Sequence, residues 1–200
     1  NGAQAGTDQP PGPAVYRRAG SVFTVWGGDQ APLQRNVYGF CEAPDGSYWF
    51  ATGNGLTQWS RGLWRSWTSH DGLRSERVFS VAAGRDGCIW FGDQAHGLGV
   101  LENGTVRYYT STDGLLSDGV WDVKVDSVGT VWVTTRSGAA SFARGIWNSY
   151  GSASGLEHKA LWPLLIEGQN ALFGTVGGGV AILHRQDDYA HPPQVRAAPN

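Results

Sequence analysis

The chain has 200 residues, of which 16 % are charged and 40 % hydrophobic, and its formal net charge is −2. Fifteen Lys and Arg residues against 17 Asp and Glu residues argue against a basic surface for nucleic acid or an anionic membrane, so we expect neither partner. Thirty Gly and ten Trp residues are typical of a turn-rich β protein and exclude a disordered or coiled-coil chain.

The first residues are polar and rich in Pro, and they predict a tail over residues 1–12. Residues 13–26 align with the last two strands of the repeat that follows, so they predict a partial unit without its first two strands. Because the chain contains no Met, residue 1 is not an encoded translation start, and we expect a piece of a longer protein.

From residue 36 onward, one pattern recurs four times at intervals of 41 or 42 residues. Three series of apolar positions keep this interval: Val37, Val78, Val120 and Leu161; Trp49, Trp90, Trp132 and Leu172; and Trp26, Trp67, Tyr109 and Tyr150. A fixed period near 40 indicates a repeat architecture, in which each unit buries its apolar face against the next.

Within each period the pattern is that of strands. Phe79 and Val81 alternate with small residues, and Trp121 and Val123 alternate with polar ones, so each pair is expected on one face of a strand. We expect first strands near residues 36–43, 77–84, 119–126 and 160–166. Asp-Gly turns, a second strand carrying the Trp, and Gly clusters before a third and a fourth strand complete the unit.

Four short strands per period of about 40 to 45 residues are the signature of a propeller blade. The predicted fold class is therefore all-β, a β-propeller of about four blades with four antiparallel strands each. A β-sandwich with regular turns would not keep three position series in register over four periods. A parallel solenoid is the other alternative, but the repeat is too long for one of its coils.

The sequence predicts a tail over 1–12, propeller repeats over 13–187 and a linker toward a following domain over 188–200. The repeats comprise a partial blade at 13–26 and blades at about 36–68, 77–110, 119–150 and 160–187. The incomplete ends could complement each other and close a ring of four, which would remove exposed sheet edges. We expect instead an arc of a larger ring.

The repeat motif carries a family resemblance. Asp71-Gly72-Leu73 precedes the Val78 strand, and Asp86-Gly87-Cys88-Ile89-Trp90-Phe91-Gly92 and Gly97-Leu98 follow it. This pattern resembles the two-component regulator propeller repeat, which reads roughly D-G-L, a V-x-x-I strand, D-G-x-L-W-x-G-T and a G-G-L strand. The resemblance covers roughly residues 20–184. The last copy replaces the motif Trp with Leu172 and shortens its turn by one residue, which predicts a degenerate terminal blade.

The resemblance implies a function and a location. Proteins with such repeats are often extracytoplasmic sensor regions of bacterial two-component or hybrid histidine kinases, so it implies a periplasmic or extracellular ligand-sensing segment. Its partners would be a small-molecule or glycan ligand, the remaining blades and a linking domain of the parent protein. No contact of this segment with a membrane is expected. The longest apolar run, residues 160–166, contains Pro163 and is too short to span a bilayer, and no signal peptide is recognisable.

Ligand contacts are expected from loop residues that differ between repeats, because the motif residues form turns and interfaces. The candidate ligand-binding residues are Arg74, Arg77, His96, Arg136, His158 and Lys159. Each can carry or acquire positive charge beside aromatic strands, which favours an acidic or hydroxyl-rich ligand such as an oligosaccharide. For Asp71 and Asp113, in the D-G-L motifs, we expect turn capping.

No catalytic, cofactor or metal motif accompanies these residues. The five His residues lack metal-ligand spacing, and no phosphate-binding or nucleophile motif occurs, so we expect no cofactor and no metal. Cys41 and Cys88 fall on non-equivalent strand positions and are expected as isolated, buried thiols.

Two other classes remain. Streptogramin lyases resemble this repeat family and place catalytic His residues over the channel, where His70, His96 or His158 could serve as a general base. A pure interaction scaffold is the third class.

Overall fold

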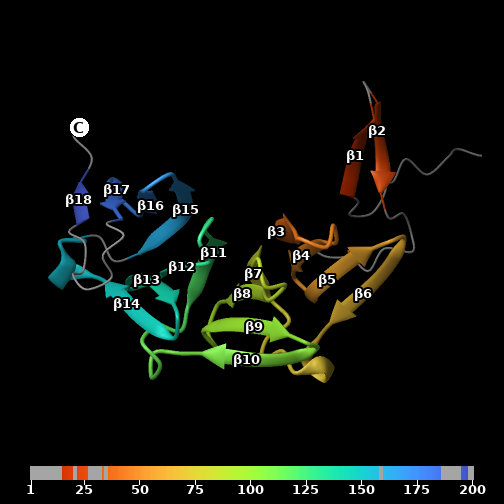
Figure 1. Cartoon of the computed structure of the whole chain (residues 1–200), viewed down its shortest axis with the longest axis horizontal. Helices are drawn as coiled ribbons and strands as arrows, with labels where there is room; N and C mark the ends of the chain where they lie inside the picture. The colour runs from red at the N-terminus through yellow and green to blue at the C-terminus, as the bar shows by residue number, and fades with distance from the viewer. Residues whose placement is uncertain are drawn as a thin grey trace, which may run out of the picture.

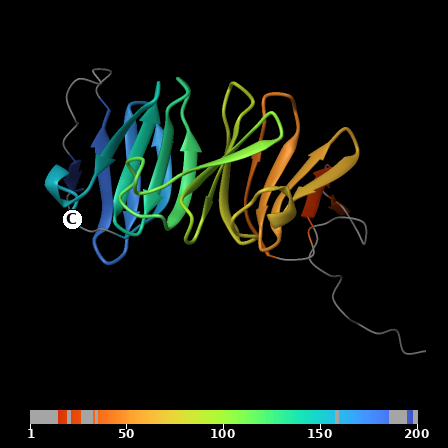
Figure 2. The same ribbon diagram turned by 90° about the horizontal axis from the view of Figure 1, so that it is seen from below.

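The computed structural model describes residue 33, residues 36–157 and 160–185, and the backbone of strands at 15–19, 22–26 and 195–197. This part of the chain contains four four-stranded antiparallel sheets and one two-stranded sheet, and no α-helix. The four large sheets follow one another along an open arc (Figure 1) and stand side by side when the molecule is turned (Figure 2). The all-β propeller prediction is confirmed.

Each large sheet is one blade, a meander that runs from the concave to the convex side of the arc (Figure 1). Blades 1 and 2 consist of β3 (Val37–Glu42), β4 (Tyr48–Thr52), β5 (Gly55–Ser60) and β6 (Leu63–Trp67), then β7 (Val78–Ala83), β8 (Ile89–Asp93), β9 (Leu98–Glu102) and β10 (Thr105–Tyr109). Blades 3 and 4 consist of β11 (Val120–Val125), β12 (Val131–Thr135), β13 (Gly138–Ala143) and β14 (Ile146–Tyr150), then β15 (Leu161–Glu167), β16 (Asn170–Thr175), β17 (Gly179–His184) and β18 (Val195–Ala197). The four first strands lie where the repeat placed them.

Three strands lie at the ends of the repeat region. β1 (Val15–Ala19) and β2 (Val22–Trp26) form the two-stranded sheet, in the segment expected as a partial blade. β18 pairs with β17 and completes blade 4, using three residues of the segment 188–200 in which a linker was expected. The sequence did not reveal this strand, because three residues are too few to show an alternating pattern of apolar and polar side chains.

The blades are joined by apolar cores between neighbouring sheets. Trp49, Trp90 and Trp132 are 5 %, 7 % and 4 % exposed, so they are buried as predicted. Trp49 packs with Phe91 between blades 1 and 2, Trp90 belongs to the core between blades 2 and 3, and Trp132 to the core between blades 3 and 4. Each buried Trp contributes about 1.5 to 3 kcal/mol or more of transfer free energy.

The D-G-L motif fastens the loop between blades. The Asp71 carboxylate accepts the Thr68 backbone N–H at 2.9 Å and closes a capping box on the 3-10 helix η2 (Ser69–Asp71). Asp113 accepts the Thr110 N–H at 2.8 Å in the same way, so the expected capping role is confirmed. The motif leucines, Leu73, Leu115 and Leu156, are buried in the three interblade cores. A second 3-10 helix, η3 (Ser152–Ser154), occupies the equivalent loop before blade 4.

A register shift interrupts the first strand of every blade. The pairing of first and second strands skips one residue at Tyr38, Phe79 and Trp121, and two residues at Trp162-Pro163. Such bulges turn the extra side chain away from the regular alternation. The expectation that Phe79 shares a face with Val81, and Trp121 with Val123, is therefore wrong: both valines belong to the interblade cores, whereas Phe79 and Trp121 stand outside these cores on the concave side.

Both cysteines are free, and Cys88 is buried while Cys41 is partly buried. Burial raises the pKa of each thiol from 9.0 to about 11. No helix in the described part of the chain has the length and apolar character needed to cross a bilayer.

We predict that Trp90→Ala destabilises the fold by about 3 to 5 kcal/mol, because it leaves a cavity between blades 2 and 3. Chemical denaturation of both proteins measures the difference. His70→Ala, an exposed residue of η2, is the control and should stay within about 0.5 kcal/mol. An unchanged denaturation midpoint for Trp90→Ala would show that this ring does not anchor the interface.

We also predict a loss of stability in alkali. The thiol pKa values are higher in the folded than in the unfolded chain, because burial favours the neutral thiols. The part of the free energy of unfolding that depends on neutral thiols is therefore fully present below pH 9 and is lost as the pH rises from about 9 to about 11. Thermal melts across this range should show the decline, and it should be smaller in a Cys41→Ala, Cys88→Ala double variant. An identical decline in that variant would contradict the assignment to the thiols.

Candidate functional site

The concave side of the arc contains a groove with a volume of about 410 Å³. It lies on the inner strands β3, β7, β11 and β15, which run side by side in Figure 1. The lining residues are Val37, Tyr38, Gly39, Phe40, Phe79, Ser80, Val81, Trp121, Asp122, Lys124 and Trp162. This volume lies within the range of small-molecule sites.

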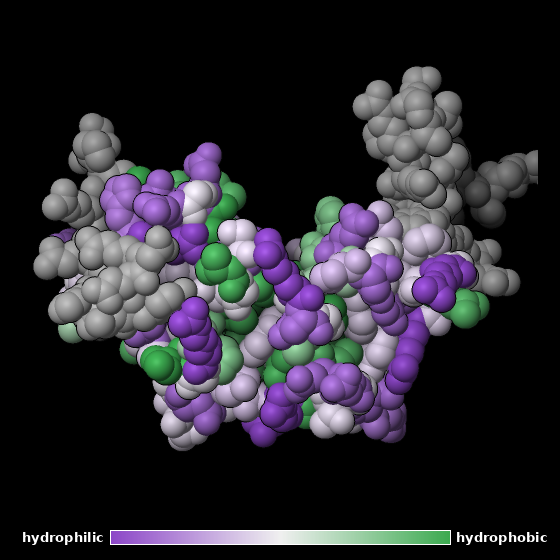
Figure 3. Space-filling view, viewed as in Figure 1, coloured by the Kyte–Doolittle hydropathy of each residue, from purple (hydrophilic) through white to green (hydrophobic). Residues whose placement is uncertain are grey.

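An aromatic strip runs along this groove, with one ring from each blade. Its members are Tyr38, Phe79, Trp121 and Trp162, the residues at the four bulges. Successive ring centroids lie 5.1, 6.3 and 5.7 Å apart. Tyr38 and Trp162 are 41 % and 59 % exposed, so the bulges place large rings at the surface instead of in the cores. Hydrophobic side chains at the concave margin lie among hydrophilic ones in Figure 3.

A polar cluster interrupts the apolar lining beside the strip. The buried Asp122 carboxylate accepts the Leu164 backbone N–H of blade 4 at 3.0 Å through Oδ2 and binds Lys124 Nζ at 3.1 Å through Oδ1. Leu164 is the first residue of β15 that pairs with β16 after the bulge. Ser80 Oγ, one blade away, is buried and has no hydrogen-bond partner within the described residues.

Arg136 lies beside the groove, against the lining residue Trp121. Its guanidinium carbon is 5.6 Å from the centroid of the Trp121 ring, a cation–π distance. It comes from the β12–β13 turn, and Gly119 leaves room for it: a Cβ at residue 119 would lie 3.2 Å from Arg136 Cδ and 3.1 Å from the Gln94 carbonyl oxygen. Within residues 36–157 and 160–185, no ion pair involves Arg136.

The equivalent turn of blade 2 differs from those of the other blades. At the end of the second strand, Thr52, Thr135 and Thr175 each donate a hydroxyl hydrogen bond to a turn glycine carbonyl at 2.8 to 2.9 Å. Blade 2 has Asp93 there, and its fully buried carboxylate cannot donate this bond. Oδ1 instead accepts the backbone N–H groups of Ala95 and His96 at 2.8 and 2.6 Å, and Oδ2 has no partner in the described part of the chain.

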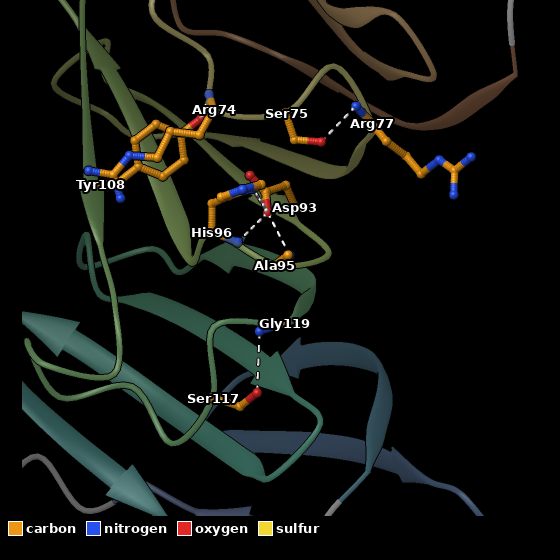
Figure 4. A network of polar contacts seen from close by, with 9 residues as sticks. All are labelled: Arg74, Ser75, Arg77, Asp93, Ala95, His96, Tyr108, Ser117 and Gly119. Atoms are coloured by element: carbon orange, nitrogen blue, oxygen red, sulfur yellow. Dashed lines mark hydrogen bonds and ion pairs between the residues drawn. The ribbon is translucent and has the colours of Figure 1, made fainter. Parts of the chain in front are cut away.

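The Asp93 carboxylate also orients the His96 ring (Figure 4). His96 Nδ1 lies 3.2 Å from Asp93 Oδ1, so Nδ1 donates and Nε2 is left for other partners. The His96 side chain is 42 % exposed. The geometry is that of an oriented imidazole at the rim of the arc.

Arg74 and Arg77 belong to the loop between blades 1 and 2 and extend away from each other (Figure 4). Arg74 stacks on Tyr108 of the outermost strand β10, with 4.6 Å from its guanidinium carbon to the ring centroid. The backbone N–H of Arg74 donates to the Tyr108 hydroxyl at 2.9 Å. Burial, with the nearby Asp93 charge, raises the pKa of Tyr108 to about 12. Arg77 is exposed directly before the inner strand β7.

Of the six residues predicted from the sequence, the structure brings Arg136 to the groove, whereas Arg74 lies over the outermost strand. His158 and Lys159 lie outside the described residues. Within the described ranges, no three His, Cys, Asp or Glu side chains gather as a metal site requires. Sequence reasoning missed the aromatic strip. Its signal was present as a fourth series at intervals of 41, 42 and 41 residues, the bulged positions 38, 79, 121 and 162.

No protein-family model matches the chain, and no curated protein matches it. Solved structures do. The extracellular domain of a hybrid two-component system from B. thetaiotaomicron has a TM-score of 0.67 at 18 % identity, covering 83 % of this chain and 25 % of that one. A catalytically inactive virginiamycin B lyase from Staphylococcus aureus with quinupristin has a TM-score of 0.69 at 14 % identity, covering 97 % and 72 %. PorZ, a surface component of the type-IX secretion system of Porphyromonas gingivalis, has a TM-score of 0.65 at 15 % identity, covering 88 % and 29 %.

These likenesses establish the fold. At identities of 14 to 18 %, the similar structures share the propeller architecture with this chain, and they include extracellular sensor domains, as the resemblance to the two-component regulator propeller repeat implied. The chain spans about a quarter of the length of that two-component sensor domain. The structure is that of a β-propeller arc, a fold that this chain shares with the extracellular domain of a two-component system, a lyase and a secretion-system surface component.

Proposed function

We propose that this chain is a ligand-sensing segment of an extracellular or periplasmic propeller, in a two-component sensor that passes its signal to a downstream kinase. The ligand is a small molecule or an oligosaccharide and binds in the concave groove. The remaining blades and a linking domain of the parent protein are its other partners. The extracellular domain of a two-component system among the structural neighbours supports this class.

The aromatic strip is the observation that carries the proposal. Blade interfaces already bury the apolar residues that the fold requires, and the strip residues stand outside these cores. Four neighbouring rings that remain partly or largely solvent-accessible form a contiguous apolar patch, which marks a binding surface. The groove beneath them has the size of a ligand site, and Arg136 supplies a charge beside it, against Trp121.

We predict that Trp162→Ala and Arg136→Ala each weaken ligand binding without loss of the fold, because both side chains lie at the groove and are exposed. A glycan array and a small-molecule library, read by tryptophan fluorescence, identify a ligand for the chain. Leu63→Ala changes an exposed apolar residue of β6, the outermost strand of blade 1, and is the control that should bind as the parent does.

Arg74→Ala tests the position of the site in the same assay. If ligand binding is lost in Arg74→Ala and kept in Trp162→Ala and Arg136→Ala, the ligand binds over the outer strands, and the groove proposal is wrong.

An acid–base enzyme is a second candidate, and the Asp93–His96 pair favours it. A buried carboxylate that holds Nδ1 and leaves Nε2 accessible is the arrangement of a general base. A lyase occurs among the structural neighbours. We predict that any turnover of a cyclic depsipeptide such as quinupristin, followed by mass spectrometry, is abolished in His96→Gln. Turnover that persists in this variant would remove His96 from the chemistry, and turnover by the parent would move the function from sensing to catalysis.

A further inference from the structure

The rings of the aromatic strip crowd one another. Successive centroids lie 5.1, 6.3 and 5.7 Å apart, with interplanar angles of 56°, 20° and 38°. A sugar that stacks on an aromatic side chain needs an open ring face, and the two middle rings, Phe79 and Trp121, each have a neighbouring ring on both sides and are partly buried. The Arg136 guanidinium also lies over the Trp121 ring. The strip therefore offers a crowded apolar surface with a cation beside it, which suits an apolar body that carries an anionic group.

The charges of the groove point the same way. Lys124 and Asp122 bind each other, so this pair adds no net charge to the lining. Arg136 has no ion-pair partner among the described residues, and it lies against Trp121, the third ring of the strip. A guanidinium presents two parallel N–H donors, which match a carboxylate in a bidentate pair.

Few groups of the groove suit a ligand covered with hydroxyls. Three of the lining side chains, Ser80, Asp122 and Lys124, are strongly polar, and two of them already bind each other. Hydroxyls laid along the rings would lose water without gaining a partner from them, which is costly.

We infer that the groove binds an amphiphilic carboxylate, with an apolar chain or ring along the strip and its carboxylate on Arg136. This inference rests on the proposed function and names the chemical class of its ligand. The volume of about 410 Å³ accommodates a molecule of this kind.

Decanoate, below its critical micelle concentration, is the test probe for the whole chain. Decanol keeps the apolar body without the charge, and a galacturonate oligosaccharide keeps the carboxylate without the apolar body. Binding is followed by tryptophan fluorescence and calorimetry for the parent, Arg136→Gln and Trp162→Ala. Arg85→Gln and Leu63→Ala are matched controls: Arg85 is exposed in the turn at the other end of blade 2, and Leu63 is exposed on β6, the outermost strand of blade 1.

We expect the parent to bind decanoate about tenfold to a hundredfold more tightly than decanol, the range of a charge-assisted hydrogen bond. Arg136→Gln should abolish this difference and leave decanol binding unchanged. Trp162→Ala should weaken both probes by a similar factor. Both controls should bind as the parent does.

Other outcomes overturn the inference in distinguishable ways. If the galacturonate oligosaccharide binds in an Arg136- and Trp162-dependent manner and decanoate does not, the groove is a ligand site and the proposed function stands, but the ligand class is wrong. If decanoate binds the parent, Arg136→Gln and Trp162→Ala equally, it binds elsewhere on the molecule. If no probe binds, the amphiphilic class is wrong, and the library screen with Trp162→Ala decides the proposed function separately.

Discussion

Burial of the sheet faces that neighbouring blades share is the constraint on which the rest of this structure depends. A four-stranded sheet of about 35 residues cannot bury enough apolar area by itself, so each blade is stable through its neighbours. Trp90 illustrates the arrangement, because its ring is contributed by blade 2 and is covered by Phe142 of blade 3, with 5.9 Å between centroids. Packing sheet against sheet in this way brings the inner strands β3, β7, β11 and β15 next to one another. The groove is therefore a product of the interblade cores rather than of any one blade.

The bulges convert this scaffold into a site. A regular strand offers its side chains to two faces, and both faces of an inner strand are already committed to neighbouring blades. One extra residue in β3, β7 and β11, and two in β15, create a third direction, toward the concave side, without removing Val81 or Val123 from the cores. Since the bulge recurs at the same position of each blade, the four extra side chains align in one strip. The same sequence repeat that forms the interblade cores thus also forms the aromatic strip on the concave surface.

Much of this could be predicted from the sequence, and the limits have physical reasons. The Trp and Val series revealed blades, strand positions and buried anchors, because interblade burial imposes a fixed residue type at a fixed interval. Phe79 and Trp121 were assigned to the same face as Val81 and Val123, since an alternating pattern does not reveal where the ladder skips a residue. Arg74 and Arg136 looked alike as loop cations. Their surroundings differ because Arg74 stacks on Tyr108 and Arg136 on Trp121. Neither ring is a sequence neighbour of its arginine: Tyr108 lies on β10 and Trp121 on β11.

The junction of blades 3 and 4 differs from the other two by its charged groups. Besides the core around Trp132, Asp126 accepts a hydrogen bond from Arg185 at the end of β17, and Asp122 accepts the Leu164 N–H. Buried carboxylates of this kind are stable only while their partners stay in place, so each fixes the position of the last blade more strictly than apolar contact does. Asp122 also holds Lys124, which lines the groove. One carboxylate therefore belongs both to the wall of the candidate site and to the attachment of blade 4, and any rearrangement of Lys124 in the groove acts on the group that holds the backbone of the last blade.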